Sequence, residues 1–273
     1  KTALAEAEIE YQDHTSVTIY ARVPVKQPSH PALEGANIVI WTTTPWTMPG
    51  NRAMACGADI DYSVLRITGL AEGALAKDGD VICLATELVG DVTSAIGIAS
   101  TETLATLKGR DIEGTVSLHP MNGHGYDHDV PMLLADYVTT DQGTGFVHIA
   151  PGHGVEDYEL AHLEHGIPLP DTVAEDGKIM GHLPIFASMH VLRDNARIAE
   201  IMAEHGGVIG IGKLVHSYPH SWRSKAPLVY RNTAQWFVSM ESHGLRDTAV
   251  SELGRTAFYP VSYTHLTLPT KSG

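Results

Sequence analysis

The feature that most constrains this chain is an apolar run, Ala36 to Trp41, that stops at three threonines and a proline. The run has the length and composition of a buried β-strand. Because Pro45 cannot continue a hydrogen-bonded ladder, the strand must end at Thr42 to Thr44. Threonine hydroxyls donate and accept hydrogen bonds, which suits the rim of a small polar site. Threonine also simply favours strands, so this run alone leaves both interpretations open.

A second segment, Gly143 to Tyr158, predicts a strand, a turn and the start of a helix. Phe146 and His148 share one face of the short strand, because side chains alternate across it. The turn falls at residues 150–154, and helical spacing continues to His165. Asp157 then lies in the first helical turn, where the helix dipole favours a carboxylate. Asp157 is therefore either a helix cap or a site residue, and His148 either a packed strand histidine or a site residue.

The rest of the pattern indicates a mixed α/β, strand-rich chain. Ser16 to Val25 alternates apolar and polar residues, as a half-exposed strand does. Further strands are predicted at Asp61 to Thr68 and at Asp80 to Ala85. Thr86 and Asp194 are candidate caps for the helices that follow them. No internal repeat is visible.

Composition and the pattern of apolar residues indicate in which compartment the chain is found. The 273 residues include no apolar stretch near the roughly 20 residues that a membrane span needs. No N-terminal signal segment is visible, so we expect a cytoplasmic protein with no membrane contact. Cys56 and Cys83 lie in or beside apolar runs, which predicts two buried free thiols in a reducing compartment.

The net charge of −14 is unfavourable for tight RNA binding, because phosphate contacts need lysine and arginine. One stretch differs from this balance, since residues 213–231 contain no Asp or Glu. Its basic residues are Lys213, Arg223, Lys225 and Arg231. They form either a local RNA-facing strip or an ordinary solvated hairpin.

Sixteen histidines raise the possibility of a metal site. By residue type, His148, His153 and Asp157 could bind a metal ion. Their spacing matches no standard zinc helix motif, so we predict no metal ligands. A metal-dependent hydrolase stays a less favoured alternative.

Two strings together resemble the editing (CP1) domain of the isoleucyl-tRNA synthetase family, bacterial type. They are TTTPWT-x-P-x-N at residues 42–51 and GTG-x-V-H-x-APGHG-x-x-D at residues 143–157. The resemblance runs from Lys1 to about Pro260 and implies a β-barrel-like editing domain decorated with helices. The HIGH-like and KMSKS-like signatures of ATP-dependent activation are absent from the sequence. We therefore expect a fragment of an isoleucine-tRNA ligase that does not itself make aminoacyl-adenylate.

The resemblance implies hydrolytic editing, which is the deacylation of misacylated valyl-tRNA(Ile). Asp157 would pair with the α-ammonium of the substrate, and His148 would bound the pocket and exclude isoleucine. Thr42, Thr43 and Thr44 would hydrogen-bond the aminoacyl group and position water. Whether a protein group or the substrate itself activates that water is left open.

The same resemblance implies a wider set of substrate-binding residues. They are Trp41, Trp46, Asn51, Gly143, Thr144, Gly145, Phe146 and His153. The expected partners are the 3′ end of tRNA(Ile) and valine or similar misactivated amino acids, bound by a monomer without a cofactor. ATP would bind only in the missing catalytic domain. A non-catalytic tRNA-binding or structural fragment is the alternative.

Some relatives carry two cysteines near residues 219–225, where this chain has Ser221 and Ser224, which excludes a thiolate zinc site there. We expect residues 1–30 to form a linker from the catalytic domain and entry strands, and 31–212 the editing domain. Residues 213–260 would form a return hairpin and a segment toward the catalytic domain. Residues 261–273 depart from the family pattern and resemble translated sequencing-adapter DNA, so we expect a non-native tail.

Overall fold

The computed structural model of the chain describes residues 4–234 and 236–257. The fold is mixed α/β and strand-rich, as predicted, with ten strands in one sheet. Contacts divide the chain into two units, Lys1–Asn232 and Thr233–Gly273. The expected tail, 261–273, lies outside the described residues. The boundary expected at 212/213 falls within a strand, and the assignment of the segments to linker, editing and return roles stays a prediction.

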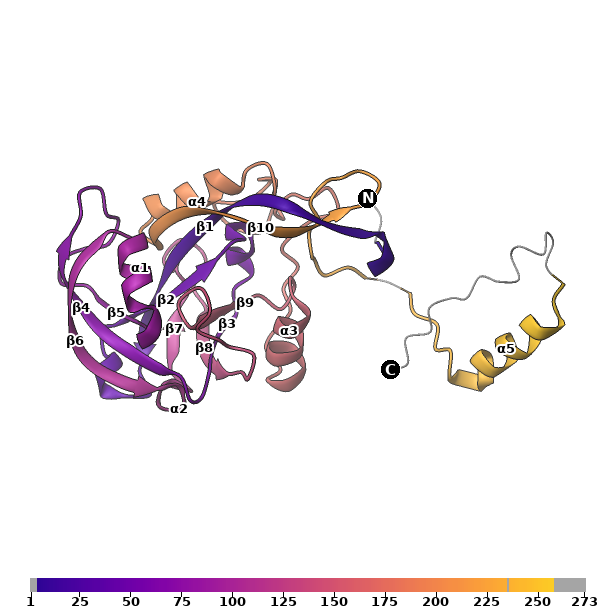
Figure 1. Cartoon of the computed structure of the whole chain (residues 1–273), viewed down its shortest axis with the longest axis horizontal. Helices are drawn as coiled ribbons and strands as arrows, with labels where there is room; N and C mark the ends of the chain where they lie inside the picture. Colours follow the sequence, from indigo (N-terminus) through magenta and orange to yellow (C-terminus); the bar gives the residue numbers. More distant parts are fainter. Residues whose placement is uncertain (1–3, 235, 258–273) are drawn as a thin grey trace. The chain divides into compact units, whose positions relative to one another are not determined.

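One long strand, β1 (Ile9–Gln27), organises the sheet of the first unit. Ile19, Ala21 and Val23 are buried and alternate with less buried residues, as the sequence pattern predicts. The prediction is wrong before Ile19, where the polar Ser16 and Thr18 are buried and Val17 is less so. Antiparallel β10 (Val208–Ser221) pairs with β1 from Ile9 to Ala21. Figure 1 shows these two strands running together as a ribbon. Farther along, β1 pairs with β2 and then with β7, so a single strand joins several parts of the sheet.

Six strands form a barrel-like enclosure. Their order in the sheet is β2, β1, β7, β8, β3 and β9. The strand β9 contacts β2 again across the remaining seam, which confirms the barrel-like character expected from the resemblance. The bounds are β2 (Asn37–Thr42), β3 (Ala53–Cys56), β7 (Val116–Leu118), β8 (Asp129–Leu134) and β9 (Phe146–Ile149).

Three further strands extend the sheet outward from β2. First comes β5 (Val81–Ala85), parallel to β2, and then antiparallel β4 (Asp61–Leu70) and β6 (Ile98–Lys108). The sequence pattern predicts both β4 and β5 to within two residues. The barrel therefore carries a three-stranded extension that pairs with the first residues of β2.

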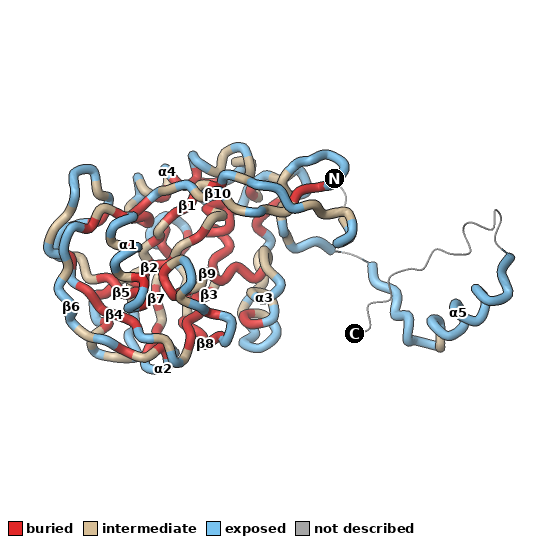
Figure 2. Tube along the Cα trace, viewed as in Figure 1, coloured by how far each residue is buried: buried red, intermediate tan, exposed pale blue. Residues whose placement is uncertain are grey.

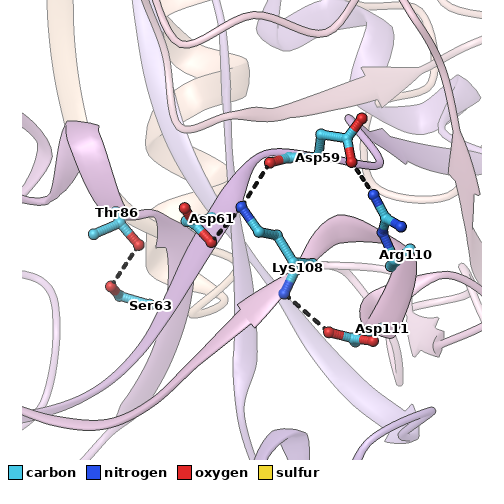
Figure 3. Close-up of polar contacts among 7 residues, drawn as sticks. All are labelled: Asp59, Asp61, Ser63, Thr86, Lys108, Arg110 and Asp111. Atoms are coloured by element: carbon cyan, nitrogen blue, oxygen red, sulfur yellow. Dashed lines mark hydrogen bonds and ion pairs between the residues drawn. The ribbon is translucent and has the colours of Figure 1, made fainter.

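The predicted cap at Thr86 is wrong. Thr86 is the first residue of a 3-10 turn, η4 (Thr86–Leu88), that leads into α1 (Val89–Ala95). Its hydroxyl lies 2.9 Å from the Ser63 hydroxyl on β4, as Figure 3 shows, and caps no helix. The Thr86 side chain therefore bonds to Ser63 on the neighbouring strand β4 instead of capping the helix that follows it.

Longer helices lie outside the barrel. Asp194 precedes α4 (Asn195–Glu204) as predicted, but its carboxylate accepts from the His190 backbone N–H at 2.7 Å instead of from the helix. The predicted helix after residue 154 is present as α3 (Val155–Asp157), continued by the π-helix η5 (Tyr158–Glu164). The short helices not yet named in the first unit are η1 (Glu6–Glu8), η2 (Pro31–Leu33), η3 (Pro45–Gly50) and α2 (Gly109–Ile112).

Buried residues follow the strands of the first unit and the short helix η3, whereas many residues in the outer loops are exposed, as Figure 2 shows. Cys56 and Cys83 are both buried and free, as predicted. Burial raises the pKa of the Cys56 thiol to about 12, so this thiol stays protonated at neutral pH. The two cysteines therefore pack as small apolar side chains.

The second unit contains the 3-10 turn η6 (Ser242–Gly244) and α5 (Leu245–Arg255). No residue of these two helices is buried within the unit. Across residues 4–234 and 236–257, no helix combines the length and the apolar character that crossing a bilayer requires.

Tyr62 joins three segments of the first unit. Its hydroxyl donates to the Gly145 carbonyl at 2.7 Å and accepts from the Gly57 N–H at 3.1 Å. Its ring stacks on Phe146 with centroids 4.3 Å apart. Tyr62→Phe keeps the ring but leaves both backbone groups unpaired, so we expect a loss of about 1–3 kcal/mol in the free energy of unfolding, measured in urea. Tyr11→Phe at an exposed position should change it by less than about 0.5 kcal/mol, and equal losses would contradict the assignment.

Candidate active site

A pocket of about 270 Å³ lies where the end of β2 faces β9. Its walls come from the threonines after β2, from β9, and from the turn and helix that follow β9. The lining residues are Trp41, Thr42, Thr43, Thr44, Thr47, Val147, His148, Ala150, His153 and Asp157. The two segments singled out in the sequence therefore meet in one place, which we call the threonine pocket.

The threonine hydroxyls form a hydrogen-bonded chain along one wall. Thr42 Oγ1 accepts from the Thr44 N–H and also lies 3.1 Å from Thr44 Oγ1. Thr44 Oγ1 is 3.2 Å from Thr47 Oγ1, and the Thr47 hydroxyl donates to the Thr44 carbonyl at 2.8 Å. Thr43 also lines the pocket, and its hydroxyl has no hydrogen-bond partner among the described residues. The Thr43 hydroxyl is therefore available to a ligand.

His148 is held at both ring nitrogens. The Asn51 amide nitrogen lies 2.7 Å from Nδ1, and the Thr47 hydroxyl lies 3.0 Å from Nε2. Burial lowers the pKa of His148 to about 3, so the ring is neutral at physiological pH. An amide nitrogen only donates, so Nδ1 is the acceptor and Nε2 carries the proton given to Thr47. In this arrangement neither nitrogen is free to take a proton from water.

The orientation of Asn51 follows from its other neighbours. Its amide nitrogen also lies 3.0 Å from the Ala53 carbonyl and 3.4 Å from the Ile149 carbonyl, which are acceptors only. The side chain is fully buried and does not line the threonine pocket. Its Oδ1 has no partner among the described residues, a desolvation cost that the three contacts of the nitrogen offset. Asn51 therefore reaches the pocket only through His148.

Asp157 enters the pocket from the first turn of α3. One carboxylate oxygen accepts from the Ala150 N–H at 2.7 Å, across the turn between β9 and the helix. The cap position of α3 is Gly154, and no side chain caps this helix. Burial raises the pKa of Asp157 to about 6, although the Ala150 contact lowers it. A half-buried carboxylate with one oxygen uncommitted is suited to a cationic ligand.

His153 forms a rigid wall of the same pocket. Its Nδ1 lies 2.8 Å from the Tyr230 carbonyl, so Nδ1 carries the proton. Its Nε2 then accepts from the Thr172 hydroxyl at 2.5 Å, and burial lowers the pKa of the ring. The ring meets Trp46 edge to face with centroids 5.0 Å apart. Trp46 is buried behind His153 and does not line the pocket.

The glycine-rich start of the second segment lies beside the pocket and not in it. The Thr144 carbonyl accepts from Ala85 at 2.8 Å, and a side chain on Gly145 would collide with Ala85. Phe146 is buried against Tyr62. Gly143 lines a neighbouring pocket. These residues fasten β9 to β5 and β4, and any contact with substrate stays a prediction for them.

Three lining residues were not singled out from the sequence: Thr47, Val147 and Ala150. Thr47 is the important omission, because it connects the threonine chain to His148. It lies within the TTTPWT string, three residues after Thr44. A 3-10 turn after Pro45 brings positions three residues apart together, which is the signal that points to Thr47.

Two of the four cations of the possible RNA-facing strip pair with carboxylates or an aromatic ring. Lys225 pairs with Glu10 at 2.5 Å, and Arg223 lies 3.9 Å from Glu8 and over the Trp222 ring.

Within residues 4–234 and 236–257, no three His, Cys, Asp or Glu side chains are grouped to hold a metal ion.

Comparisons with known proteins relate this chain to isoleucine–tRNA ligases. Isoleucine–tRNA ligase of Pelagibacter ubique is 47% identical over 264 residues, covering 95% of this chain and 28% of that protein. The enzyme of Caulobacter vibrioides is 46% identical over 286 residues, covering 95% and 29%. This chain thus spans less than a third of the length of these relatives.

The cytosolic leucyl-tRNA synthetase editing domain of P. knowlesi has a TM-score of 0.53 at 10% identity, covering 75% of this chain and 97% of that one. At this identity the likeness concerns the fold, and it confirms the expected editing-domain architecture. The family model of the class I tRNA synthetases (I, L, M and V) matches residues 1–268, and the chain belongs to this family.

Proposed function

We propose that this chain hydrolyses the ester bond of misacylated valyl-tRNA(Ile), as the editing part of an isoleucine-tRNA ligase. The observation that carries this proposal is the placement of the Asp157 carboxylate and a neutral, doubly held His148 in one pocket bordered by threonine hydroxyls. Kinship to isoleucine–tRNA ligases supports the same reaction class. We propose that the chain is a cytoplasmic monomer and that its partners are tRNA and amino acids. ATP would bind to other parts of the longer relatives.

Asp157 would bind the free α-ammonium of the aminoacyl group. One of its oxygens is fixed by Ala150, which leaves the other to accept a charge-assisted hydrogen bond. An ammonium group in the pocket would also compensate for the burial that raises the pKa of this carboxylate. This contact would orient the ester relative to the threonines.

His148 would select by size. A hydrophobic pocket separates substrates that differ by one methylene by only about 1–3 kcal/mol, a general limit for which isoleucine against valine is the standard illustration. A second site that admits valine and excludes isoleucine must therefore have a rigid wall. Hydrogen bonds to Asn51 and Thr47 prevent the His148 ring from turning aside for a larger side chain.

The protein would position the attacking water molecule but would not supply the base that deprotonates it. His148 and His153 both use their acceptor nitrogen internally, so neither supplies a general base in this arrangement. The Thr43 hydroxyl is available to hold a water molecule or the ester carbonyl. The water would attack the carbonyl carbon, the ester C–O bond would break, and the ribose oxygen would leave as a hydroxyl. Substrate-assisted activation of that water fits these contacts best.

The first test is selectivity. The isolated chain should release valine from valyl-tRNA(Ile) at least about tenfold faster than isoleucine from isoleucyl-tRNA(Ile), because one methylene must be rejected. Release of each amino acid from preformed aminoacyl-tRNA measures both rates. A non-catalytic tRNA-binding fragment predicts no release above buffer, and either that result or equal rates would refute selective editing.

Asp157→Asn separates a binding role from a structural one. The amide oxygen can still accept from Ala150, but the charge is lost, so kcat/KM should fall about 10- to 100-fold. In the wild type, kcat/KM should also fall about tenfold per pH unit below about pH 6, where Asp157 becomes protonated. Glu156→Gln is the control and should change kcat/KM by less than about twofold, because Glu156 is exposed and outside the pocket.

The same variant should be more stable. The folded-state pKa of Asp157 is about 6 against 3.8 for the free side chain, so ionisation is penalised in the folded state. Above pH 6, Asp157→Asn should therefore raise the free energy of unfolding by about 1–3 kcal/mol, and the gain should vanish below about pH 4. Urea unfolding at pH 7.5 and pH 3.5 measures this. A variant that is less stable yet fully active would show that Asp157 serves structure alone.

His148→Ala tests the size gate. Removing the ring should open space and allow hydrolysis of isoleucyl-tRNA(Ile), so the preference for valine should fall about tenfold or more. A general-base role predicts that both substrates slow together, and a purely structural role predicts loss of the cooperative circular-dichroism melt. His165→Ala, at an exposed position, is the matched control. Unchanged rejection of isoleucine by a folded His148 variant would overturn the gate.

A further inference from the structure

A second pocket of about 310 Å³ adjoins the threonine pocket. The two pockets share one wall, Trp41, at the end of β2. The second pocket lies between α1, the residues before β9 and the β1–β10 pair. Its lining residues are Thr18, Tyr20, Trp41, Leu88, Asp91, Val92, Ala95, Asp141, Gln142, Gly143, Gly212, Lys213 and Leu214. We call it the Lys213 groove.

Lys213 differs from most other cations of the first unit because no ion pair is recorded for it in the described residues. Figure 3 shows two of the usual pairs, Lys108 with Asp61 and Arg110 with Asp59. The paired cations of the first unit are Arg22, Lys26, Arg66, Lys108, Arg110, Lys178, Arg193, Arg197, Arg223 and Lys225. In a chain of net charge −14, an uncommitted lysine beside the candidate active site is available to a ligand.

We propose that Lys213 binds a backbone phosphate of the tRNA 3′ strand as that strand passes through the Lys213 groove. This inference rests on the proposed function. An aminoacyl ester in the threonine pocket is attached to a ribose, and that ribose is attached to the phosphates of the strand. The strand must leave the pocket on some side, and the groove beyond Trp41 adjoins it directly. Trp41 and Tyr20 in its walls offer aromatic faces of the kind that single-stranded nucleic acids use.

The charges in the groove limit the contact to about one phosphate. Asp91 and Asp141 also line the groove and repel phosphates. Burial, together with the charge of Asp91, raises the pKa of the Tyr20 hydroxyl, so this group stays neutral and can hydrogen-bond. Lys213 is exposed on β10, so its side chain is accessible to a ligand in the groove. One charged contact, and not a broad basic surface, would position the strand.

The test compares a substrate with phosphates and a substrate without them. Deacylation of valyl-tRNA(Ile) and of 2′(3′)-O-valyladenosine is measured for the wild type, Lys213→Ala and Lys213→Arg. Lys77→Ala is the matched control, because Lys77 is an exposed lysine that has no recorded ion pair and lies outside both pockets. Each variant is assayed on the full chain at several salt concentrations, with a circular-dichroism melt to verify folding.

Lys213→Ala should lower kcat/KM for valyl-tRNA(Ile) roughly three- to tenfold and change it for valyladenosine by less than about twofold. Its kcat/KM should also depend less on salt, with the slope of log kcat/KM against log salt reduced by about 0.7, the value for one phosphate on a single strand. Lys213→Arg should restore most of the rate, and Lys77→Ala should match the wild type.

Three results would overturn the assignment: no effect of Lys213→Ala on the tRNA substrate, equal loss on both substrates, or an equal effect of Lys77→Ala. Failure of the proposed function is a separate result, because the wild type would then hydrolyse neither ester. Wild-type hydrolysis of both esters with an indifferent Lys213 would refute only this inference.

Discussion

The candidate site depends on two hydrogen bonds to one histidine. Thr47 and Asn51 follow β2, His148 lies on β9, and about 100 residues of chain separate the two sides. These strands meet at the seam of the barrel, where side chains connect the segments. Because each nitrogen of a neutral imidazole has a fixed role, the donor Asn51 also determines which nitrogen faces Thr47 with a proton. The bonds that join the two strands thus also fix the wall of the pocket.

Burial of the Asp157 carboxylate lowers the stability of the folded chain. The chain buries a carboxylate whose pKa rises to about 6 and gives it a single backbone donor. A helix cap would instead have its pKa lowered and would stabilise the helix. In the proposed function, the ammonium group of the substrate would offset the cost of this buried charge. Position in the first helical turn alone predicts a lowered pKa, so the raised pKa argues against a capping role for Asp157 and favours the proposed binding role.

Many strands and both segments of the candidate site can be predicted from the sequence, and the features that cannot be predicted have physical causes. Apolar runs and alternation located β2, β4 and β5, because strand burial is local information. Both pocket segments were found, but their meeting at a seam depends on barrel closure, which is a long-range property. Thr86 was misassigned because a hydroxyl near a helix start can also bond across a sheet, as it does with Ser63. Asn51 was expected to touch substrate, whereas its complete burial behind His148 only emerges from packing.

The pairing of lysine and arginine with carboxylates affects how an acidic chain can act on RNA. Cations that pair with carboxylates have little attraction left for phosphate, and most of those in the first unit are paired. Non-specific RNA affinity should therefore be low, and the tRNA would be held mainly by other parts of the longer relatives. In the proposed function, such a site would recognise the end of the strand through one cation at the groove and one anion in the pocket. The ammonium and the phosphate of an aminoacylated 3′ end carry the complementary pair of charges, so only a strand that still bears its amino acid satisfies both contacts.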